Sequence, residues 1–595
     1  MTRNLVERGK TSSSSNGKKT SLSGALCYEV AVKAVYMLTA FRCSQDTERQ
    51  SSRIPPASDA DWEVPRPLEA DTTKTAPDIR WRDLPNKDQL FILALCRLSE
   101  PLSNVCLLPY IFYLVRSLLS VSEDDNSTDN SAARISEYSG LLVAAFPLAQ
   151  CVISLPWGRL SDTHGRRFSI IGGLFISVIA NVGFGLSRSF EALFFWRIIA
   201  GLANGNVSIM RTVTAEVVRE RKYQTKAFLL LPLVFNSGMV LSLALGGCLA
   251  EPVVNLPALF GPSGIFNSSG YPDGVKWALE YPYALPALLN AFLLGTSLCL
   301  AVLGLKETLP GKEEQSDWGL QFGKVIGRLA MRLWNRGSAY HKYTMMQDSE
   351  ESTFLNHSQP SLEKTEPSVV TTESAKVPFR SIWTRRVISA LVSFGLLPLH
   401  NSAFMHIFPV YLSSPPAENT EATFFAFSGG LGLRSATIGI WLAAFGIGGI
   451  LLQLFIYPLL QKRIGTRGVF RIALFLFPVT YIAAPYLSLL AGDGDVRWVF
   501  LGFIVCAQIM ARTMAIPSTV ILLTEATPAR TVLGTIHGAG NMLASLARAV
   551  GPAVGGYVFA LGVEKGVIGL VWWLYLVGVA LCALAWSYLT EGGSG

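Results

Sequence analysis

Two long apolar runs that carry no charge most constrain what this chain can fold into. Leu141–Trp157 and Phe168–Leu186 contain no Asp, Glu, Lys or Arg, and the ten residues between them, Gly158–Arg167, carry three arginines and one aspartate. A helix of about 17–25 residues crosses a ~30 Å hydrocarbon core. Because short loops rich in Lys and Arg stay in the cytoplasm, the sequence predicts two spanning helices joined by a tight cytoplasmic connector.

The composition extends this reading to most of the chain. Hydrophobic residues make up 50% of the sequence and charged residues 15%, whereas a soluble domain is about 25% charged; we therefore expect a lipid bilayer around the protein. The formal charge of +8 lies mostly in the tails and in alternate loops, which is the topology bias of membrane proteins and requires no nucleic-acid partner. The nine cysteines are scattered without a CxxC pair, so we expect no disulfide framework, metal site or cofactor.

The apolar runs fall into two groups of six, which predicts an all-α polytopic membrane protein with twelve transmembrane helices. The expected parts are a mostly disordered cytoplasmic tail, an N-terminal half, a cytoplasmic linker, a C-terminal half and a short tail, over residues 1–87, 88–305, 306–383, 384–590 and 591–595. No signal peptide is expected, because no clean apolar core follows the charged N-terminal region; a transit peptide or a different start codon stays open. The expected spans are 89–114, 141–157, 168–186, 191–212, 227–250, 281–305, 386–411, 435–460, 469–490, 496–524, 532–561 and 567–589.

Similar residues recur in the two halves at a nearly constant spacing, which indicates an internal repeat. Four pairs of residues differ by 300 and three pairs by 309, all at corresponding span ends: Pro109 and Pro409, Gly158 and Pro458, Gly165 and Gly465, Arg167 and Arg467, then Glu216 and Glu525, Gly246 and Gly555, Gly247 and Gly556. The second copy of the connector is degraded, with Lys462 and Thr466 in place of Asp162 and Arg166. We therefore expect the first copy to carry the specialised gating role.

The connector pattern Gly-x-Leu-Ser-Asp-x-x-Gly-Arg-Arg resembles the signature between the second and third spans of major facilitator superfamily transporters. Further phrases narrow the resemblance, over roughly residues 80–590, to fungal proteins related to the plant zinc-induced facilitator-like carriers, within the drug:proton antiporter group: Arg97–Pro101, Pro109-Tyr110, Gly205–Val207, Arg211–Glu216, Tyr281–Pro286 and Ser545–Arg548. The resemblance implies two parallel six-helix halves with the substrate between them near mid-membrane.

Glycine motifs in the spans resemble helix-packing sites of the same superfamily. Gly551-Pro552-Ala553-Val554-Gly555-Gly556 resembles a motif that antiporters carry in span five, yet it stands here in span eleven. Span five keeps only the paired glycines, Gly246 and Gly247, and lacks the proline, which leaves antiport polarity open. In span four, Gly201 and Gly205 are expected to allow close helix packing.

Ionisable side chains inside the spans are the candidates for proton coupling, because each costs about 2.5–3.5 kcal/mol on insertion scales and marks a functional site by default. Arg97 and Glu100 lie three residues apart and share a helix face. Glu100 is either a protonation site tuned by burial and by Arg97, or half of a static ion pair. By resemblance, Arg197 matches the fourth-span arginine associated with proton coupling. His400 follows Glu100 by 300 residues, so it could face the same cavity and serve proton coupling by titrating near neutrality; the alternative is a histidine that is hydrogen-bonded within the packing.

The connector is expected to form the inner gate together with an acidic residue at the end of span four. Its expected members are Gly158, Asp162, Gly165, Arg166, Arg167 and Glu216. We expect Glu216 to pair with Arg166. By resemblance, Asp162 would lie at the N-terminus of span eleven, where the helix dipole favours negative charge, and this contact would hold the outward-open state.

Polar residues elsewhere in the spans are candidates for the substrate cavity or, alternatively, for interhelical hydrogen bonds. They are Asn204, Asn236, His406, Gln453, Arg512, His537 and Asn541. Two of the histidines could instead bind a transition metal, and Arg512 and Arg548 could hold an anionic group or pair internally. Asn126 and Asn267 match the N-glycosylation pattern in loops expected outside the cell.

These features predict a secondary active transporter that works by alternating access, with a proton gradient driving export of a small molecule or ion from the cytosol or its sequestration in the vacuole. We expect a monomer in the plasma or vacuolar membrane with both termini cytoplasmic. The alternatives are a proton symporter or facilitator, and a non-transporting membrane sensor with the same fold. An enzyme is not expected, because there is no nucleophile motif, and the absence of GxxxxGK[ST] argues against direct ATP drive.

Overall fold

The computed structural model describes residues 84–122, 131–218, 220–268, 270–309, 312, 318–325, 328, 383–416, 427, 429–490, 494–528 and 533–589. Within these ranges the regular structure is helical, apart from one isolated bridge between Pro416 and Gly429. The predicted all-α class is therefore confirmed.

The described part of the N-terminal half is built from long and short helices and a helical loop. The helices are α2 (Lys87–Arg97), α3 (Ser99–Asn104), α4 (Ile111–Ser122), α5 (Ser131–His164), α6 (Arg166–Gly185), α7 (Phe190–Ala203), α8 (Asn206–Val217), α9 (Arg221–Leu249) and α13 (Ala284–Gly304). The loop between α9 and α13 holds the short helices α10 (Pro252–Asn255), α11 (Pro257–Phe260) and α12 (Lys276–Glu280).

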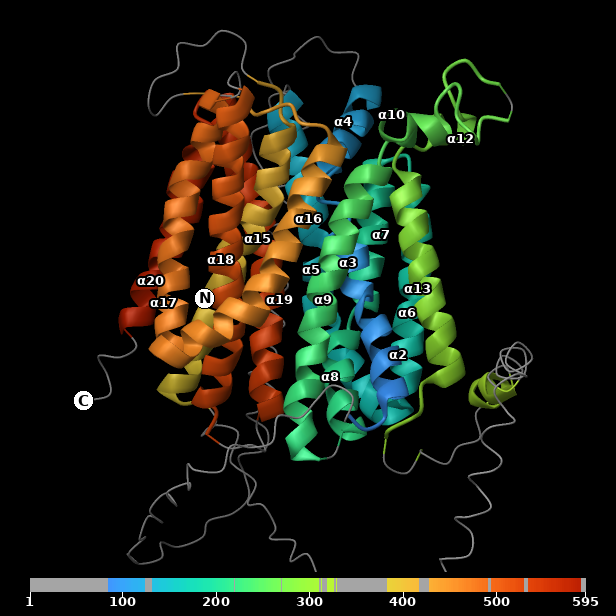
Figure 1. Cartoon of the computed structure of the whole chain (residues 1–595), viewed down its shortest axis with the longest axis vertical. Coiled ribbons are helices and arrows are strands. Elements are labelled where there is room, and N and C mark those ends of the chain that lie inside the picture. The colour runs from blue at the N-terminus through green and yellow to red at the C-terminus, as the bar shows by residue number, and fades with distance from the viewer. Residues whose placement is uncertain are drawn as a thin grey trace, which may run out of the picture. The chain divides into compact units, whose positions relative to one another are not determined.

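The C-terminal half packs beside it, with α9 and α16 next to each other (Figure 1). Its described elements are α15 (Arg385–Ser413), α16 (Ser435–Leu451), η4 (Leu452–Ile456), α17 (Tyr457–Ala483), η5 (Ala484–Leu490), α18 (Gly494–Ala526), α19 (Leu533–Glu564), η7 (Val571–Leu576) and α20 (Val577–Leu589).

In the described residues, ten helical segments are long and apolar enough to cross a membrane. One of them, Ser435–Leu490, is divided by a non-helical glycine, Gly465, and so covers two predicted spans. The first predicted span is not among the ten, because it is broken into the short helices α2, α3 and α4. The arrangement is consistent with the twelve predicted spans.

The outer surfaces of both halves present large apolar side chains. Phe175 on α6, Phe292 on α13, Val499 on α18 and Leu574 in η7 are all more than half exposed. Exposed apolar surface of this extent is unfavourable in water and marks contact with lipid. These side chains therefore form the face expected to meet the bilayer.

The break in the first span has a local cause. Pro101 has no N–H to donate to the carbonyl of Arg97, and it occupies the first turn of α3, where proline is tolerated. The helix therefore ends at Arg97 and restarts at Ser99. As a result, Glu100 lies in the first turn of a separate six-residue helix in the middle of the span.

The predicted repeat is visible in the backbone of the two connectors. Gly165 has φ 114° and Gly465 has φ 72°, and each lies between two successive long helices. L-residues with side chains rarely adopt positive φ. The same conformation at positions 300 apart is what related halves require.

The two halves touch most closely at the end that carries residues 251–283, which we call the loop end. A Cβ atom at Gly247 on α9 would lie 2.6 Å from the Cα of Gly439 on α16. On the other side of the interface, a Cβ at Gly556 on α19 would lie 3.1 Å from the Cα of Gly140 on α5. The predicted packing glycines therefore bring the halves into backbone contact at the loop end.

The halves separate at the opposite end, which carries Gly165 and which we call the connector end. Along the antiparallel pair of α5 and α19, the thiol of Cys151 still lies 3.6 Å from the carbonyl oxygen of Met542. Further along, a Cβ at Gly158 or at Gly538 would meet no described atom within 4 Å. The space between the halves, which we call the cleft, thus opens toward the connector end.

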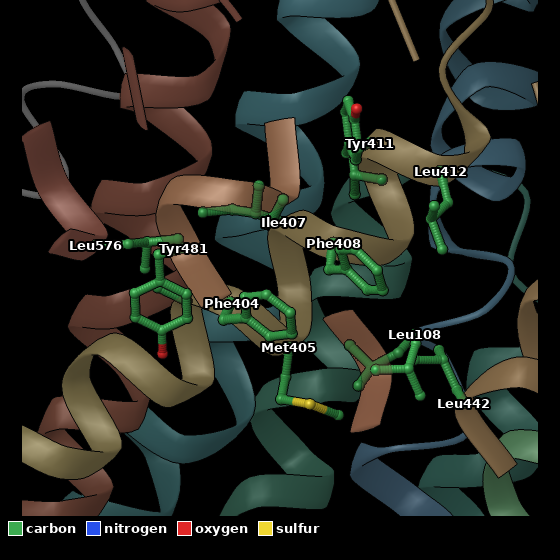
Figure 2. Packing of buried hydrophobic residues seen from close by; sticks show 14 of the residues in the cluster. Leu108, Phe404, Met405, Ile407, Phe408, Tyr411, Leu412, Leu442, Tyr481 and Leu576 are labelled. Carbon is green, nitrogen blue, oxygen red and sulfur yellow. The ribbon is translucent and has the colours of Figure 1, made fainter. Parts of the chain in front are cut away.

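The core at the loop end is continuous across both halves. Figure 2 shows Leu108 of the first half beside Leu442 of the second, within one buried cluster. Along α15, Phe404 stacks on Phe408, with ring centroids 4.9 Å apart, and on Tyr481 at 5.4 Å. This aromatic packing stabilises the C-terminal half, since Phe404, Phe408 and Tyr481 all belong to α15 or α17.

Candidate functional site

Glu100 is the centre of the charged site in the cleft. Its side chain is 3% exposed, and its Oε2 atom accepts a hydrogen bond of 2.7 Å from Nη1 of Arg97. Its Oε1 atom accepts one of 2.9 Å from Nη1 of Arg548. Since Arg97 belongs to α2 and Arg548 to α19, one carboxylate is bonded to both halves.

Neutral side chains orient the two arginines. Nη2 of Arg548 donates to Ser545 Oγ at 3.0 Å and lies 3.4 Å from Gln150 Oε1 on α5. The guanidinium carbon of Arg97 lies 4.8 Å from the ring centre of Phe235 on α9, within the range of a cation–π contact. The site is therefore fixed by α2, α3, α5, α9 and α19 together.

Arg197 is placed inside the N-terminal half instead of in the cleft. It donates to the carbonyl oxygen of Ser103 at 2.7 Å, to Oδ1 of Asn104 at 2.8 Å and to the carbonyl oxygen of Leu142 at 3.3 Å. All of these acceptors are neutral. Because Ser103 and Asn104 form the last turn of α3, Arg197 anchors the short helix whose first turn carries Glu100.

Arg512 on α18 reaches across the cleft without meeting a carboxylate among the described residues. Its Nη2 atom lies 3.1 Å from Sδ of Met239 on α9, and its Nη1 atom 4.0 Å from Sδ of Met405. Thioether sulfur is only a weak hydrogen-bond acceptor. The positive charge of Arg512 is therefore poorly compensated in this conformation.

Arg211 on α8 lies nearer the connector end and is exposed. No hydrogen bond from its guanidinium to another described residue is present, although it lies close enough to interact electrostatically with Arg97, Glu100 and Arg548. It therefore adds a further positive charge to the mouth of the cleft.

Several predicted cavity residues form contacts between the halves. Nδ2 of Asn236 donates to Oε1 of Gln453 at 2.8 Å, and His406 Nε2 lies 3.1 Å from Oγ of Ser139. Asn541 on α19 is half-buried. Asn204 is buried at the break between α7 and α8, and its side-chain atoms have no hydrogen-bond partner among the described residues.

The structure corrects the prediction that His400 faces the same cavity as Glu100. His400 is fully buried within the C-terminal half, where Nδ1 lies 2.8 Å from the hydroxyl of Tyr481 and the ring packs on Phe477. The spacing of 300 residues does not predict the position of His400, because α15 is one continuous helix whereas the first span is interrupted twice. Residues that are 300 apart in these two spans, such as Glu100 and His400, therefore do not lie on equivalent faces of their helices.

His537 is also placed away from the other histidines. Its Nε2 atom lies 3.1 Å from Oγ1 of Thr524 on α18, at the connector end. His400, His406 and His537 thus occupy three separate environments. Among the described residues no group of three or more His, Cys, Asp or Glu side chains could hold a metal ion.

The predicted gate residues form an ion-pair cluster at the connector end. Arg166 pairs with Asp162, and its Nε atom lies 3.4 Å from Oε1 of Glu216. Arg167 donates to the carbonyl oxygen of Val302 at 2.7 Å. Gly165 provides the positive φ at which α5 turns into α6.

The structure places Asp162 differently from the expected position at the start of span eleven. Its side chain is 64% exposed, and its described partner is Arg166 on the same half. The physical reason is the separation of α5 from α19 at this end. In this conformation no ion pair or hydrogen bond joins Asp162 to the described part of α19.

Glu307, which was not predicted from the sequence, caps the start of α6 beside this cluster. Its carboxylate accepts hydrogen bonds from the backbone N–H groups of Arg166 at 2.9 Å and Arg167 at 3.1 Å. A carboxylate at a helix N-terminus satisfies free N–H groups and interacts favourably with the helix dipole. An isolated acid directly after the sixth span was the sequence signal for this cap.

The remaining predicted sites have simple placements. A Cβ at Gly201 would lie 2.8 Å from the Cβ of Ala149, and Gly205 packs on Trp157. Gly246 packs on Cys106, while Gly551 and Gly555 pack on α15 and Pro552 lies against Gly140. Asn267 lies in the loop between α9 and α13, where Nδ2 donates to two backbone carbonyls. Asn126 lies outside the described residues.

Comparisons with known proteins agree with this architecture. Residues 93–432 match the Major Facilitator Superfamily. The Major facilitator superfamily multidrug transporter mfsB of Aspergillus fumigatus is 32% identical over 517 residues, which cover 83% of this chain and 81% of that protein. Protein ZINC INDUCED FACILITATOR-LIKE 1 of Arabidopsis thaliana is 25% identical over 79% of this chain and 83% of that protein. The sequence motifs predicted a resemblance to both kinds of relative, a fungal member of the superfamily and a plant zinc-induced facilitator-like protein.

A solved structure supports the fold. The crystal structure of a POT family transporter in complex with 5-aminolevulinic acid aligns with a TM-score of 0.51 at 14% identity, over 86% of this chain and 98% of that chain. Two helical halves with lipid-facing exteriors and a charged cleft between them define a multi-pass membrane transport protein. The chain belongs to the Major Facilitator Superfamily.

Proposed function

We propose that this protein is a proton-coupled exporter that moves a small molecule by alternating access. The observation that carries the proposal is the ion pair between Glu100 and Arg548, which joins the two halves in the middle of the spans. A movement that opens the loop end would draw α3 away from α19 and break this pair.

Glu100 is the proposed proton carrier. Among the described residues, every other Asp or Glu lies in a loop or within about two turns of the end of a spanning segment. A neutral carboxyl holds a guanidinium less strongly than a carboxylate does. Protonation of Glu100 would thus release Arg548 and free the halves to rock, while Arg197 keeps the other end of α3 in place.

The connector end is the proposed cytoplasmic end, because its short loops are rich in arginine. The described conformation would then be inward-open. When the connector end closes, Asp162 would reach the N-terminus of α19, the contact that the family resemblance implies. Asn267 and Asn126 would lie on the exoplasmic side and be glycosylated, and we expect a monomer in the plasma or vacuolar membrane.

The experiment is flux through proteoliposomes that contain the full chain, with an imposed pH gradient and a panel of cationic, neutral and anionic fluorescent probes. We expect at least one probe to move against the proton flow, at a rate that rises with the gradient and is absent from protein-free liposomes. Movement in the same direction as protons would favour a symporter. Flux that ignores the gradient, or no flux of any probe, would contradict the proposal.

A further inference from the structure

The cleft has an excess of positive charge. Four arginines face it from both halves, namely Arg97 on α2, Arg211 on α8, Arg512 on α18 and Arg548 on α19, against the single carboxylate of Glu100 among the described residues. Three of the four guanidinium charges are therefore not neutralised by a described side chain inside the spans.

The arginines share one space. Arg97 lies over the ring of Phe235, and Arg512 contacts the sulfur of Met239. Phe235 and Met239 are four residues apart on α9 and therefore lie on one face of that helix, one turn apart. Arg97 of the first half and Arg512 of the second thus meet the same wall of the cleft.

Two of the four arginines, Arg512 and Arg211, have no oxygen acceptor among the described residues. Arg197 shows how this chain satisfies a structural arginine, with three hydrogen bonds to oxygen atoms. Arg512 instead contacts two thioethers, and Arg211 is exposed toward the mouth of the cleft. Unneutralised cations are costly at this depth, so their arrangement favours an incoming negative group.

We infer that the cleft binds an organic anion whose carboxylate, sulfonate or phosphate group is held by Arg512 and Arg548, with Arg211 attracting it at the mouth. This inference rests on the proposed transport function and specifies the substrate class. Guanidinium groups bind such oxyanions through paired N–H donors. A converging positive surface also raises the local concentration of anions.

Such a ligand would compete with Glu100 for Arg548. The substrate anion would replace the Glu100 carboxylate as the partner of Arg548, and Glu100 would keep only Arg97. Occupation of the site and release of the link between the halves would then be one event. In this exchange one negative group replaces another at Arg548. A carboxylate at position 100 suits it, because it is of the same charge as the substrate group that displaces it.

The test measures binding and flux separately. Fluorescence anisotropy of carboxyfluorescein and of sulfonated and phosphorylated dyes is measured with the full chain in nanodiscs, and ethidium serves as the cationic probe. We expect at least one anionic dye to bind. Arg512→Met and Arg211→Gln should each weaken that binding about tenfold or more, whereas Arg512→Lys should retain most of it. Arg434→Gln, an exposed arginine at the loop end, is the matched control and should bind as wild type does.

The outcomes separate the inference from the proposed function. Failure of all anionic dyes to bind, or equal binding by wild type, Arg512→Met and Arg211→Gln, overturns the inference. If ethidium alone binds and is carried under a pH gradient, the transport function stands and the substrate class is wrong. If no probe is carried, the transport proposal fails, while the anisotropy data still decide whether the cleft is an anion site. Arg211→Gln keeps the test decisive if Arg512→Met does not fold, because Arg211 is exposed.

Discussion

Arg548 Nη1 lies 2.9 Å from Glu100 Oε1, and this ion pair joins positions 448 residues apart in the two halves of the protein. Because Glu100 is also bonded to Arg97, its single negative charge is shared between one cation of each half. The pair lies where the closed loop end gives way to the open cleft. It is therefore placed to respond to movement of the halves.

Removing the charge of Glu100 should uncouple transport from the proton gradient. For Glu100→Gln we expect flux whose rate no longer rises with the imposed pH difference, because glutamine cannot gain or lose a proton. Glu191→Gln, at an exposed position at the start of α7, is the matched control. If Glu100→Gln responds to the gradient as steeply as wild type does, Glu100 is not the proton carrier.

Breaking the ion pair from one side should destabilise the protein. Arg548→Met leaves the buried Glu100 with Arg97 as its one cation, so the loss should stay below the about 3–5 kcal/mol that an uncompensated buried charge typically costs. Combining it with Glu100→Gln should cost less than the sum of the two single losses, because loss of Arg548 breaks no ion pair once residue 100 is neutral. Thermal unfolding of the two single variants and the double variant measures the coupling. Additive effects would show that the two side chains do not stabilise each other.

The backbone contact between Gly247 and Gly439 should control closure of the loop end. Gly247→Leu places a side chain where even a Cβ would lie 2.6 Å from the Cα of Gly439, so we expect the loop end to be forced open. Accessibility of engineered cysteines at the loop end should rise. Gly172→Leu, where a Cβ meets no described atom within 4 Å, should leave it unchanged, and equal accessibility in both variants would contradict the assignment.

Removal of the Glu307 cap should weaken the gate and the start of α6. Glu307→Gln loses the charge that faces the backbone N–H groups of Arg166 and Arg167, and loss of such a helix cap typically costs about 0.5–2 kcal/mol. We expect a lower midpoint of thermal unfolding, with little change for Asp273→Asn in an exposed loop. A midpoint equal to that of wild type would show that the cap is dispensable.

The sequence was sufficient to predict the all-α membrane fold, the two related halves and the local pair of Arg97 and Glu100. Charge-free runs of membrane length are strong signals, and the glycine pair Gly165 and Gly465 marked corresponding turns. Arg97 and Glu100 are three residues apart, so helical periodicity alone brings them together; the pair of Arg166 with Asp162, four residues apart, was not predicted, although the same periodicity accounts for it.

Contacts between distant segments could not be predicted in the same way. The partner of Arg548 depends on how α19 packs against α3, and the sequence left open whether this arginine pairs internally or holds an anion. The position of His400 was wrong because Pro101 breaks one copy of the repeated helix and not the other. Glu307 was missed because a single acid after a span has no periodic pattern.

The most direct test of the account is a pair of distances between the halves, measured by spin-label resonance on the full chain in nanodiscs after replacement of its nine cysteines. Labels at Thr163 and Thr535 report the connector end, and labels at Arg116 and Arg434 report the loop end; all four positions are exposed. The account predicts that conditions which close one end open the other, so that the first distance shortens as the second lengthens. Two distances that stay fixed, or that change in the same direction, across pH and added probe would contradict alternating access by rocking of the halves.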